Sequence, residues 1–386
     1  MRELWFAVYL PSFLIAAGQQ AVLVLLPLYA LQLGGTAAFA ASLLALRGLG
    51  SLLTNLPAGV AVTRFGDKPV MMLSLSLLAV AGICLGQVQS FWLVGLLTAL
   101  YGAGSGAWLL ARLVYVTEAA PLPVRGRAIA ALGAIQRVGT LIGPVAGGVL
   151  VISAGYDMAF LAAGACAIVS LVLVLLMTRN VRHIKTPPRR SGLIRLLRVW
   201  RQERYIFGTA GVVTMSLAVL RSGRQLLLPL WGAAVGLDEA QIGLLFTFSA
   251  ALEIAMSYPA GYLLDAKGHK AAALPCFGLL IISLMLLPLA DSVLLLAGVA
   301  GLAGIGNGFG TGIIMTMGSD YAPKNQRGEF LGIWRMMGDS GQVGAPLMIG
   351  PLADLVSLGG AAVATAGAGM VGLVIMAWLV KPPVRQ

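Results

Sequence analysis

Twelve long apolar segments, separated by short polar loops, constrain this chain more than any other feature of its sequence. An α-helix needs roughly 20 apolar residues to cross the hydrocarbon core of a membrane, and the segments leave no room for a sizeable soluble domain. We therefore predict an all-α integral membrane fold with twelve transmembrane helices. The expected spans cover residues 4–32, 37–63, 69–88, 91–119, 127–153, 158–178, 205–232, 239–264, 270–290, 293–320, 328–356 and 361–380.

The composition excludes an ordinary soluble protein. Hydrophobic residues make up 59% of the 386 residues and charged residues only 10%. A soluble protein could not cover that much apolar surface with polar side chains. The 50 glycines suit packed membrane helices, in which small residues let backbones approach. The three cysteines and two histidines show no metal-ligand spacing, so we expect no metal site.

The basic residues mark one side of the membrane. When alternate loops are assigned to opposite sides, every Lys and Arg outside the spans falls on the same side as both termini. The opposite loops hold only the acids Asp157, Asp238, Glu239 and Asp291. Because cytoplasmic loops carry the excess of Lys and Arg, we expect both termini to be cytoplasmic. The net charge of +12 then reflects topology, and nucleic-acid binding is excluded.

The segment 179–204 is the one break in composition. It divides the chain into an N-terminal six-helix bundle, residues 1–178, and a C-terminal one, residues 205–386. Within it, apolar residues recur at helical spacing and arginines lie off that stripe. This pattern predicts a short amphipathic helix on the inner leaflet, attracted by anionic lipid; the alternative is a basic, solvated linker. The stripe consists of Leu193, Leu196, Leu197 and Trp200.

The two halves repeat with a constant offset of 202 positions. Each half has an even number of spans, so both halves have the same orientation. They are predicted to be parallel repeats with a substrate path between them, near the bilayer midplane. The pairs that fix the offset are Gly59 with Gly261, Gly102 with Gly304, Arg125 with Arg327 and Pro144 with Pro346.

The fifth span contains glycines and a proline at fixed spacing. Glycines permit close helix contact, whereas proline removes a backbone donor and bends the helix. The pattern resembles the GxxxGPxxGG motif of major facilitator superfamily antiporters, in the twelve-helix drug:proton antiporter branch. A generic packing seam would explain the glycines but not the full spacing. The motif residues are Gly139, Gly143, Pro144, Gly147 and Gly148.

The loop after the second span is similar to another motif of this family, GxxxDRxGRK. The first copy keeps Gly59, Arg64 and Gly66 but carries Thr63 in place of the acid and Asp67 in place of an Arg. The resemblance implies that the acid stabilises one conformation of the transporter. In the second-half copy the acid is present, which makes Asp265 the better candidate. That copy consists of Gly261, Asp265 and Gly268.

Eight charged residues lie away from the ends of the spans. A charge at the centre of a span costs about 2.5–3.5 kcal/mol on insertion scales, so each needs a partner or a watery cavity. Counting residues from the span ends places Arg137 and Glu253 near the midplane, and we expect these two to meet. The full set is Arg47, Arg112, Arg137, Arg221, Arg224, Glu253, Arg335 and Asp339.

Three further expectations concern this set. Arg335 and Asp339 are spaced i, i+4 and should pair; Asp339 is also the repeat mate of Arg137. Arg221 and Arg224 are spaced i, i+3 and should share a face. Arg47 should face the eleventh span from the other half.

A carboxyl group in a dry cavity can bind and release a proton near neutral pH. Glu253 and Asp339 are therefore the proton-coupling candidates. The first span has no acid and offers Gln19 and Gln20 to a cavity, and Trp334 is expected beside it. With six arginines against two acids, the cavity should be net positive, which favours an anionic, zwitterionic or amphipathic substrate.

We predict a secondary active exporter of small organic compounds that is driven by proton antiport and works by alternating access. The alternative is a proton-independent uniporter or importer of an organic anion. A lipid-handling protein or enzyme is the remaining class, but no nucleophile–base set, HExxH or phosphate loop is present, and no cofactor is expected. The expected partners are a small-molecule substrate, protons and membrane lipids, and the expected state is a monomer in the inner membrane.

Overall fold

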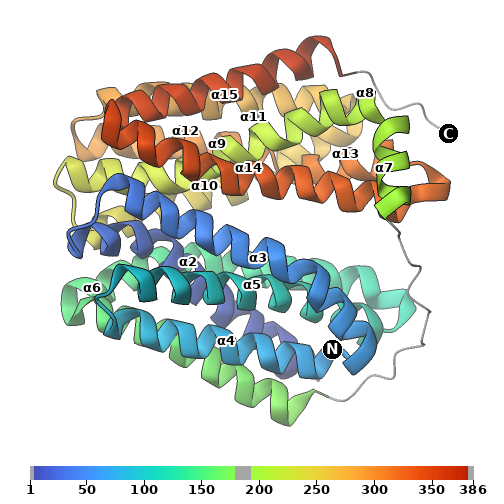
Figure 1. Ribbon diagram of the computed structural model, residues 1–386, viewed down its shortest axis with the longest axis horizontal. Coiled ribbons are helices and arrows are strands. Elements are labelled where there is room, and N and C mark those ends of the chain that lie inside the picture. Colours follow the sequence, from blue (N-terminus) through green and yellow to red (C-terminus); the bar gives the residue numbers. More distant parts are fainter. Residues whose placement is uncertain (1–3, 179–192, 381–386) are drawn as a thin grey trace. The chain divides into compact units, whose positions relative to one another are not determined.

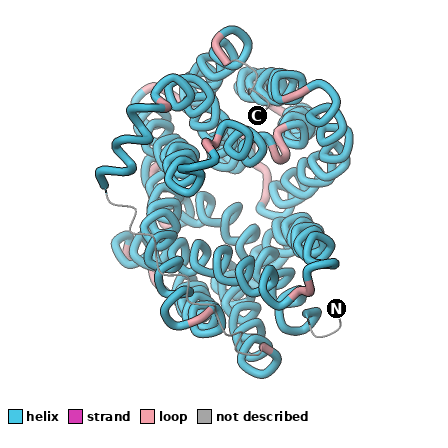
Figure 2. The backbone as a smooth tube through the Cα atoms, turned by 90° about the vertical axis from the view of Figure 1, so that its right-hand side faces the viewer, coloured by secondary structure: helices cyan, strands magenta, loops and turns pink. Residues whose placement is uncertain are grey.

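Helices make up all the regular structure in residues 4–178 and 193–380, which are the parts of the chain that the computed structural model describes (Figure 1). Figure 2 shows these helices joined by short loops. The first part of the chain runs through η1 (Trp5–Tyr9), α2 (Leu10–Gln32), α3 (Ala37–Phe65), α4 (Asp67–Gln87), α5 (Phe91–Ala119), η2 (Leu122–Val124) and α6 (Arg125–Met177).

The second part begins with the linker helix α7. The order is α7 (Leu193–Gln202), α8 (Arg204–Ile206), η3 (Phe207–Gly211), α9 (Val212–Ala234), α10 (Glu239–Lys267), α11 (His269–Leu286), η4 (Leu287–Leu289), α12 (Val293–Phe309), α13 (Ile313–Tyr321), η5 (Lys324–Gln326), α14 (Arg327–Leu355) and α15 (Leu358–Trp378).

Two compact units are formed by these helices. The first unit lies within residues 1–186 and 232–247, and the second within 187–231 and 248–386. The predicted division near residue 205 stays a prediction. The start of α10 belongs to the first unit. The reason is local bonding, because Tyr156 donates to Glu239 over 2.8 Å and Thr247 donates to the Leu141 carbonyl over 2.8 Å.

Ten helical stretches of the described chain are long and apolar enough to cross a membrane. One of them, Leu122–Met177, has 56 residues, or about 84 Å if it were straight, which is more than twice the thickness of a hydrocarbon core. Gly155 breaks it with a φ of 85° and a ψ of 170°, between the two spans predicted there. The 29-residue helix α14 is not among the ten and carries Arg335 and Asp339.

One predicted span is interrupted. The segment 293–320 was expected to be continuous, but α12 ends at Phe309 and α13 begins at Ile313. Gly312 adopts a left-handed conformation with a φ of 79°, which a residue with a Cβ atom rarely adopts. An apolar sequence with several glycines does not distinguish a glycine that packs from a glycine that turns the chain.

Repeat mates make the same contacts in the two units. Lys68 donates to the Leu175 carbonyl over 2.9 Å, and Lys270 donates to the Ala377 carbonyl over 2.9 Å. Each partner is also 202 positions from its mate. Tyr29 donates to the Val88 carbonyl and Trp231, its mate, to the Ala290 carbonyl. These atomic contacts confirm the predicted repeat.

The glycines of α5 and α12 repeat their contacts as well. A Cβ atom on Gly102 would collide with the carbonyl of Arg47, and one on Gly304 with the carbonyl of Ser249. Only glycine allows the two backbones to come this close.

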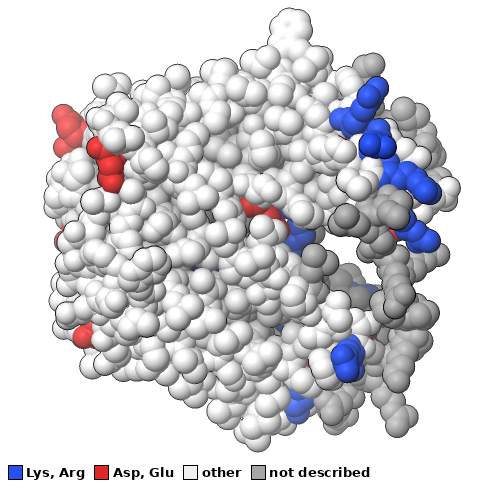
Figure 3. All heavy atoms as spheres, in the orientation of Figure 1, with Lys and Arg blue, Asp and Glu red and all other residues white. Residues whose placement is uncertain are grey.

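Charge is sorted along each unit. In the face drawn in Figure 3, most Lys and Arg gather at one end of each unit and most Asp and Glu at the other, and the surface between them is largely uncharged except for acidic and basic groups near its middle. This distribution suits helices that cross a membrane, since the apolar band can face lipid while charges remain at the two interfaces.

Candidate functional site

The best-defined charged cluster lies inside the second unit, where α9 and α10 meet the break between α12 and α13. Arg224 of α9 lies 3.7 Å from Glu253 of α10, measured from Nη2 to Oε2. Nη1 of Arg224 donates to Ser249 Oγ over 3.1 Å, and this hydroxyl donates to the Ala300 carbonyl over 2.7 Å. The bonds hold the Arg224 guanidinium in one orientation against α10.

Arg221, one turn before Arg224, reaches the helix break. Its Nη2 donates to the Gly310 carbonyl over 2.8 Å. The last carbonyls of a helix have no intrahelical partner and form the negative end of the helix dipole. The break at Gly310 therefore supplies an acceptor for a cation in the middle of an apolar segment. As their i, i+3 spacing predicts, the two arginines lie on one side of α9.

This cluster has more positive than negative charge. It holds two guanidinium groups, and Glu253 is the one carboxylate that the described residues place within 4.0 Å of either. Nε of Arg221 and Oδ1 of Asn307 are buried without a hydrogen-bond partner among those residues. The side chain of Glu253 is 32% exposed, whereas that of Arg224 is 11% exposed. Arg221 thus has no counter-charge within 4.0 Å among the described residues, at a site that is partly exposed.

Glu253 does not depend on Arg137 for a partner. We expected these two residues to meet at the midplane, but within its own unit Glu253 already pairs with Arg224. A contact with Arg137 would join the two units and stays a prediction, as does the expected position of Arg47 opposite the eleventh span. Arg47 itself is half-buried on α3, with its Nε buried and without a hydrogen bond among the described residues.

A second polar cluster lies inside the first unit, between α5 and α6. Arg112 is 3% exposed, donates to Gln136 Oε1 over 2.6 Å and lies over the Trp108 ring at 5.9 Å from its centroid. The amide of Gln19 on α2 donates to Ser105 Oγ on α5 over 3.0 Å. The described residues place no carboxylate within 4.0 Å of Arg112.

The predicted pair on α14 is present. Nε of Arg335 lies 3.8 Å from Oδ2 of Asp339, and the two side chains are 53% and 26% exposed. The expected place of Trp334 beside a cavity stays a prediction. This residue is 3% exposed, donates to the Ile314 carbonyl over 2.9 Å and stacks on Phe330 with centroids 5.9 Å apart.

The glycine–proline motif of α6 packs on two neighbours inside the first unit. An added Cβ atom on Gly139, Gly143 or Gly147 would collide with α2, and one on Gly148 with the start of α10. The contact of Gly143 includes the side chain of Gln20. The motif is therefore a two-sided packing surface, as the physical sense of its glycines predicts.

The loop motifs supply turns between helices. Gly66 and Gly268 join α3 to α4 and α10 to α11 with φ values of 95° and 80°. A Cβ atom on Gly59 or Gly261 would meet open space, so packing does not explain these two. Asp265 is exposed near the end of α10, and its role in conformational change stays a prediction, as does that of Arg64.

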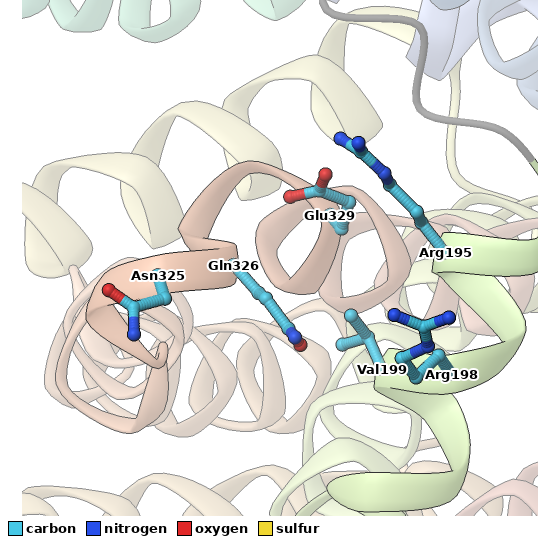
Figure 4. A pocket seen from close by; sticks show the side chains of 6 residues that line it. All are labelled: Arg195, Arg198, Val199, Asn325, Gln326 and Glu329. Carbon is cyan, nitrogen blue, oxygen red and sulfur yellow. The ribbon is translucent and has the colours of Figure 1, made fainter.

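Helix α7 forms within the linker where an amphipathic helix was expected. Val199 is 1% exposed and faces the protein, whereas Leu197 and Trp200 of the predicted stripe are 56% and 45% exposed. A surface pocket of about 240 Å³ lies between α7 and the start of α14 (Figure 4). In that view Arg198 and Gln326 lie on either side of Val199. The lining residues are Arg195, Arg198, Val199, Asn325, Gln326 and Glu329.

Sequence reasoning missed uncharged members of both clusters. Ser249 and Gln136 were not predicted, because single polar residues are common in long helices. The repeat could have indicated Ser249, since it is the mate of Arg47.

Comparison with known proteins assigns the family. The profile of the Major Facilitator Superfamily matches residues 8–223 and, again, residues 211–386. The chain belongs to the Major Facilitator Superfamily. Because this family and the relatives below are membrane transporters, the protein is a multi-pass membrane transporter and not an enzyme.

Individual relatives are distant. The chain is 26% identical to the multidrug resistance protein MdtH of Yersinia enterocolitica over 264 residues. The aligned segment covers 67% of this chain and 63% of MdtH. A crystal structure of the nucleoside transporter NupG aligns with 98% of this chain and 100% of its own, with a TM-score of 0.81 and 14% identity. A crystal structure of the human organic anion transporter MFSD10 aligns with 97% of this chain and 99% of its own, with a TM-score of 0.68 and 18% identity. At these identities the two structures support the fold alone.

Proposed function

We propose that this transporter crosses the inner membrane twelve times, as two parallel six-helix repeats with both termini in the cytoplasm. Ten apolar helical stretches support the count, because one of them is long enough for two spans and α14 supplies another long helix. The contacts shared at one offset support the parallel arrangement. The orientation is supported by the basic residues of the loops, which all fall on one side.

Within this framework, we propose that the protein exports small organic compounds by alternating access and that protons drive the transport. The observation that carries the proposal is the Arg224–Glu253 pair. It places a titratable, partly hydrated carboxylate inside a bundle of apolar helices, where ionisable groups commonly belong to ion pathways. Asp339 is the second candidate for the proton site. The named activity of the relative MdtH, multidrug resistance, supports export.

Proteoliposomes with an imposed pH gradient and a trapped pH-sensitive dye test this proposal. Aromatic anions, cations and zwitterions of similar size would be added in turn to wild type and to Glu253→Gln. The proposal expects compound-triggered proton flux in wild type and its loss in the variant. Transport of a labelled compound without proton flux, unchanged in the variant, would exclude proton coupling through Glu253.

The second candidate function is proton-independent import or uniport of an organic anion. The unbalanced guanidinium groups of Arg221 and Arg112 favour it, and the structural neighbour MFSD10 is named an organic anion transporter. The same assay separates the two functions, because this one requires saturable anion flux that does not change with the proton gradient.

A further inference from the structure

The surroundings of Glu253 determine how its charge responds to a ligand. From α9 it faces Arg224, with Arg221 one turn away. From α11 the buried thiol of Cys276 lies within electrostatic range of Arg221 and Glu253. From α12 the uncharged Gly308 lies against Glu253, because a Cβ atom on Gly308 would touch the Glu253 backbone. Among the described residues of the second unit, arginine is therefore the one charged residue type placed within 4.0 Å of Glu253.

The two arginines have different states. Arg224 forms an ion pair with Glu253 and donates a hydrogen bond to Ser249. Arg221 makes one bond to a neutral carbonyl, and its Nε is buried without a partner among the described residues. A guanidinium has five N–H donors in a planar fork that matches a carboxylate or sulfonate. The atom arrangement thus offers an anion one unsatisfied cation, next to a second cation that is already paired.

A bound anion changes the electrostatics of its neighbour. An anion bound to Arg221 adds negative charge beside Glu253. It therefore weakens the electrostatic stabilisation that the two arginines give to the ionised carboxylate. Repulsion between like charges favours the neutral, protonated form of the acid. Protonation in turn releases Arg224, which can then contribute donors to the anion.

From this geometry we infer that Arg221 and Arg224 form a binding subsite for the anionic group of an organic substrate, and that the anion and a proton on Glu253 bind together. The balance is simple: one proton adds to the Glu253 carboxylate, one anion joins the arginines, and the charge of the cluster is unchanged. A cation bound at the same place would instead favour ionised Glu253 and exclude the proton.

This inference rests on the proposed transport function and refines it. Since the proton and the anion bind together, they move in the same direction, and anions are cotransported with protons. Export by proton exchange then applies to cationic compounds, whose binding opposes that of the proton. The charge of the substrate sets the sign of the coupling.

Equilibrium binding to the purified full-length protein tests the inference without any transport step. The probes are p-toluenesulfonate and benzyltrimethylammonium, which are similar in size and keep their own charges throughout. Linkage of one proton limits the change in affinity to about tenfold per pH unit. We expect the sulfonate to bind at least about threefold more tightly at pH 6 than at pH 8, and the ammonium compound to bind more weakly at the lower pH or not at all.

Three variants identify the residues. Glu253→Gln removes the titrating group, so sulfonate affinity should become independent of pH and stay at or above the low-pH value. Arg221→Gln should lower sulfonate affinity at least about tenfold, because it removes the unpaired cation. Asp291→Asn, which removes an exposed acid in a loop of the same unit, is the matched control and should leave both affinity and pH dependence unchanged.

Several results would overturn the inference. The first two are a sulfonate affinity that does not change with pH and a pH dependence of sulfonate affinity that persists in Glu253→Gln. The others are an equal increase in affinity for the sulfonate and the ammonium compound on acidification, and no sulfonate binding at either pH. If proton flux in proteoliposomes is present while sulfonate binding ignores pH, the transport function stands and the anion subsite fails. If sulfonate binding depends on pH as expected but no proton flux is detected, the anion subsite is supported and proton-driven transport is excluded.

Discussion

The two units share a scaffold and differ in chemistry. Lys68 and Lys270 bond to equivalent carbonyls, and Gly102 and Gly304 admit equivalent backbones. At the positions of the charged cluster the correspondence ends. Where the second unit has Arg221, Arg224 and Glu253, the first unit has Gln19, Val22 and Ser51 at the same offset.

This difference separates the contacts that define the fold from those that define the site. The repeated contacts end on backbone carbonyls, which every residue provides. The contacts of the cluster end on side chains, which a single substitution can change. Arg112 strengthens the point, because its mate is Ile314 and the cation of the first unit therefore has no counterpart in the second.

The largest effect is expected at the repeated glycines. Gly102→Val and Gly304→Val place side-chain atoms against a backbone that cannot move alone, and each should cost about 1–3 kcal/mol or more. We expect strongly reduced yields of monodisperse protein for both, measured by size-exclusion chromatography. Gly133→Val, at a helical glycine with open space around it, is the control. Tolerance of one variant and not its mate would show that the two scaffolds are not equivalent.

The ion pair should give the next largest effect. Arg224→Gln leaves Glu253 without its partner in a largely apolar site, so we expect a loss of about 1–3 kcal/mol, less than for a fully buried pair because water reaches Glu253. The double variant Arg224→Gln, Glu253→Gln should recover most of that loss. Thermal unfolding of the four proteins measures the coupling energy. Additive effects would mean that the pair contributes nothing to stability.

A smaller effect is expected on α14. Arg335 and Asp339 are more exposed than the pair in the cluster, so Arg335→Gln should change stability by less than about 1 kcal/mol. The same unfolding assay measures it, at low and high salt. A loss as large as that of Arg224→Gln would contradict the ranking of the two pairs.

The smallest expected effect is a difference between matched variants of the two units, which should stay below about 1 kcal/mol. Lys68→Met removes the hydrogen bonds from this lysine to the Leu175 and Thr178 carbonyls, and Lys270→Met removes the bond to the Ala377 carbonyl. Each should cost about 0.5–1.5 kcal/mol. Thermal unfolding of the two single variants measures the loss of stability in each unit. A difference in that loss above about 1 kcal/mol would show that the lysine of one unit stabilises the protein more than its mate does.

The sequence was sufficient for features that depend on spacing along one helix or on a fixed offset. The spans follow from apolar length, the Arg335–Asp339 pair from its i, i+4 spacing, and the shared contacts from the offset of 202 positions. These features require no knowledge of how helices rotate about their axes.

The partner of Glu253 could not be obtained in this way. Arg137 and Arg224 both lie deep in their spans, and only the rotation of α9 against α10 shows that Arg224 faces the acid. The break at Gly310–Gly312 was missed for a related reason. Glycine occurs both at close helix contacts and at turns, so the sequence did not indicate that Gly310 exposes a carbonyl to Arg221.

The glycine contacts have a consequence for how such a protein changes over generations. The close contacts of α5 with α3 and of α12 with α10 are made through backbone atoms at Gly102 and Gly304, so these two helix pairs do not depend on the charged side chains of the site. A duplicated half can therefore lose or acquire a charge at the site without losing its ability to fold. New transport specificities can arise in one half while the other continues to preserve the ancestral architecture.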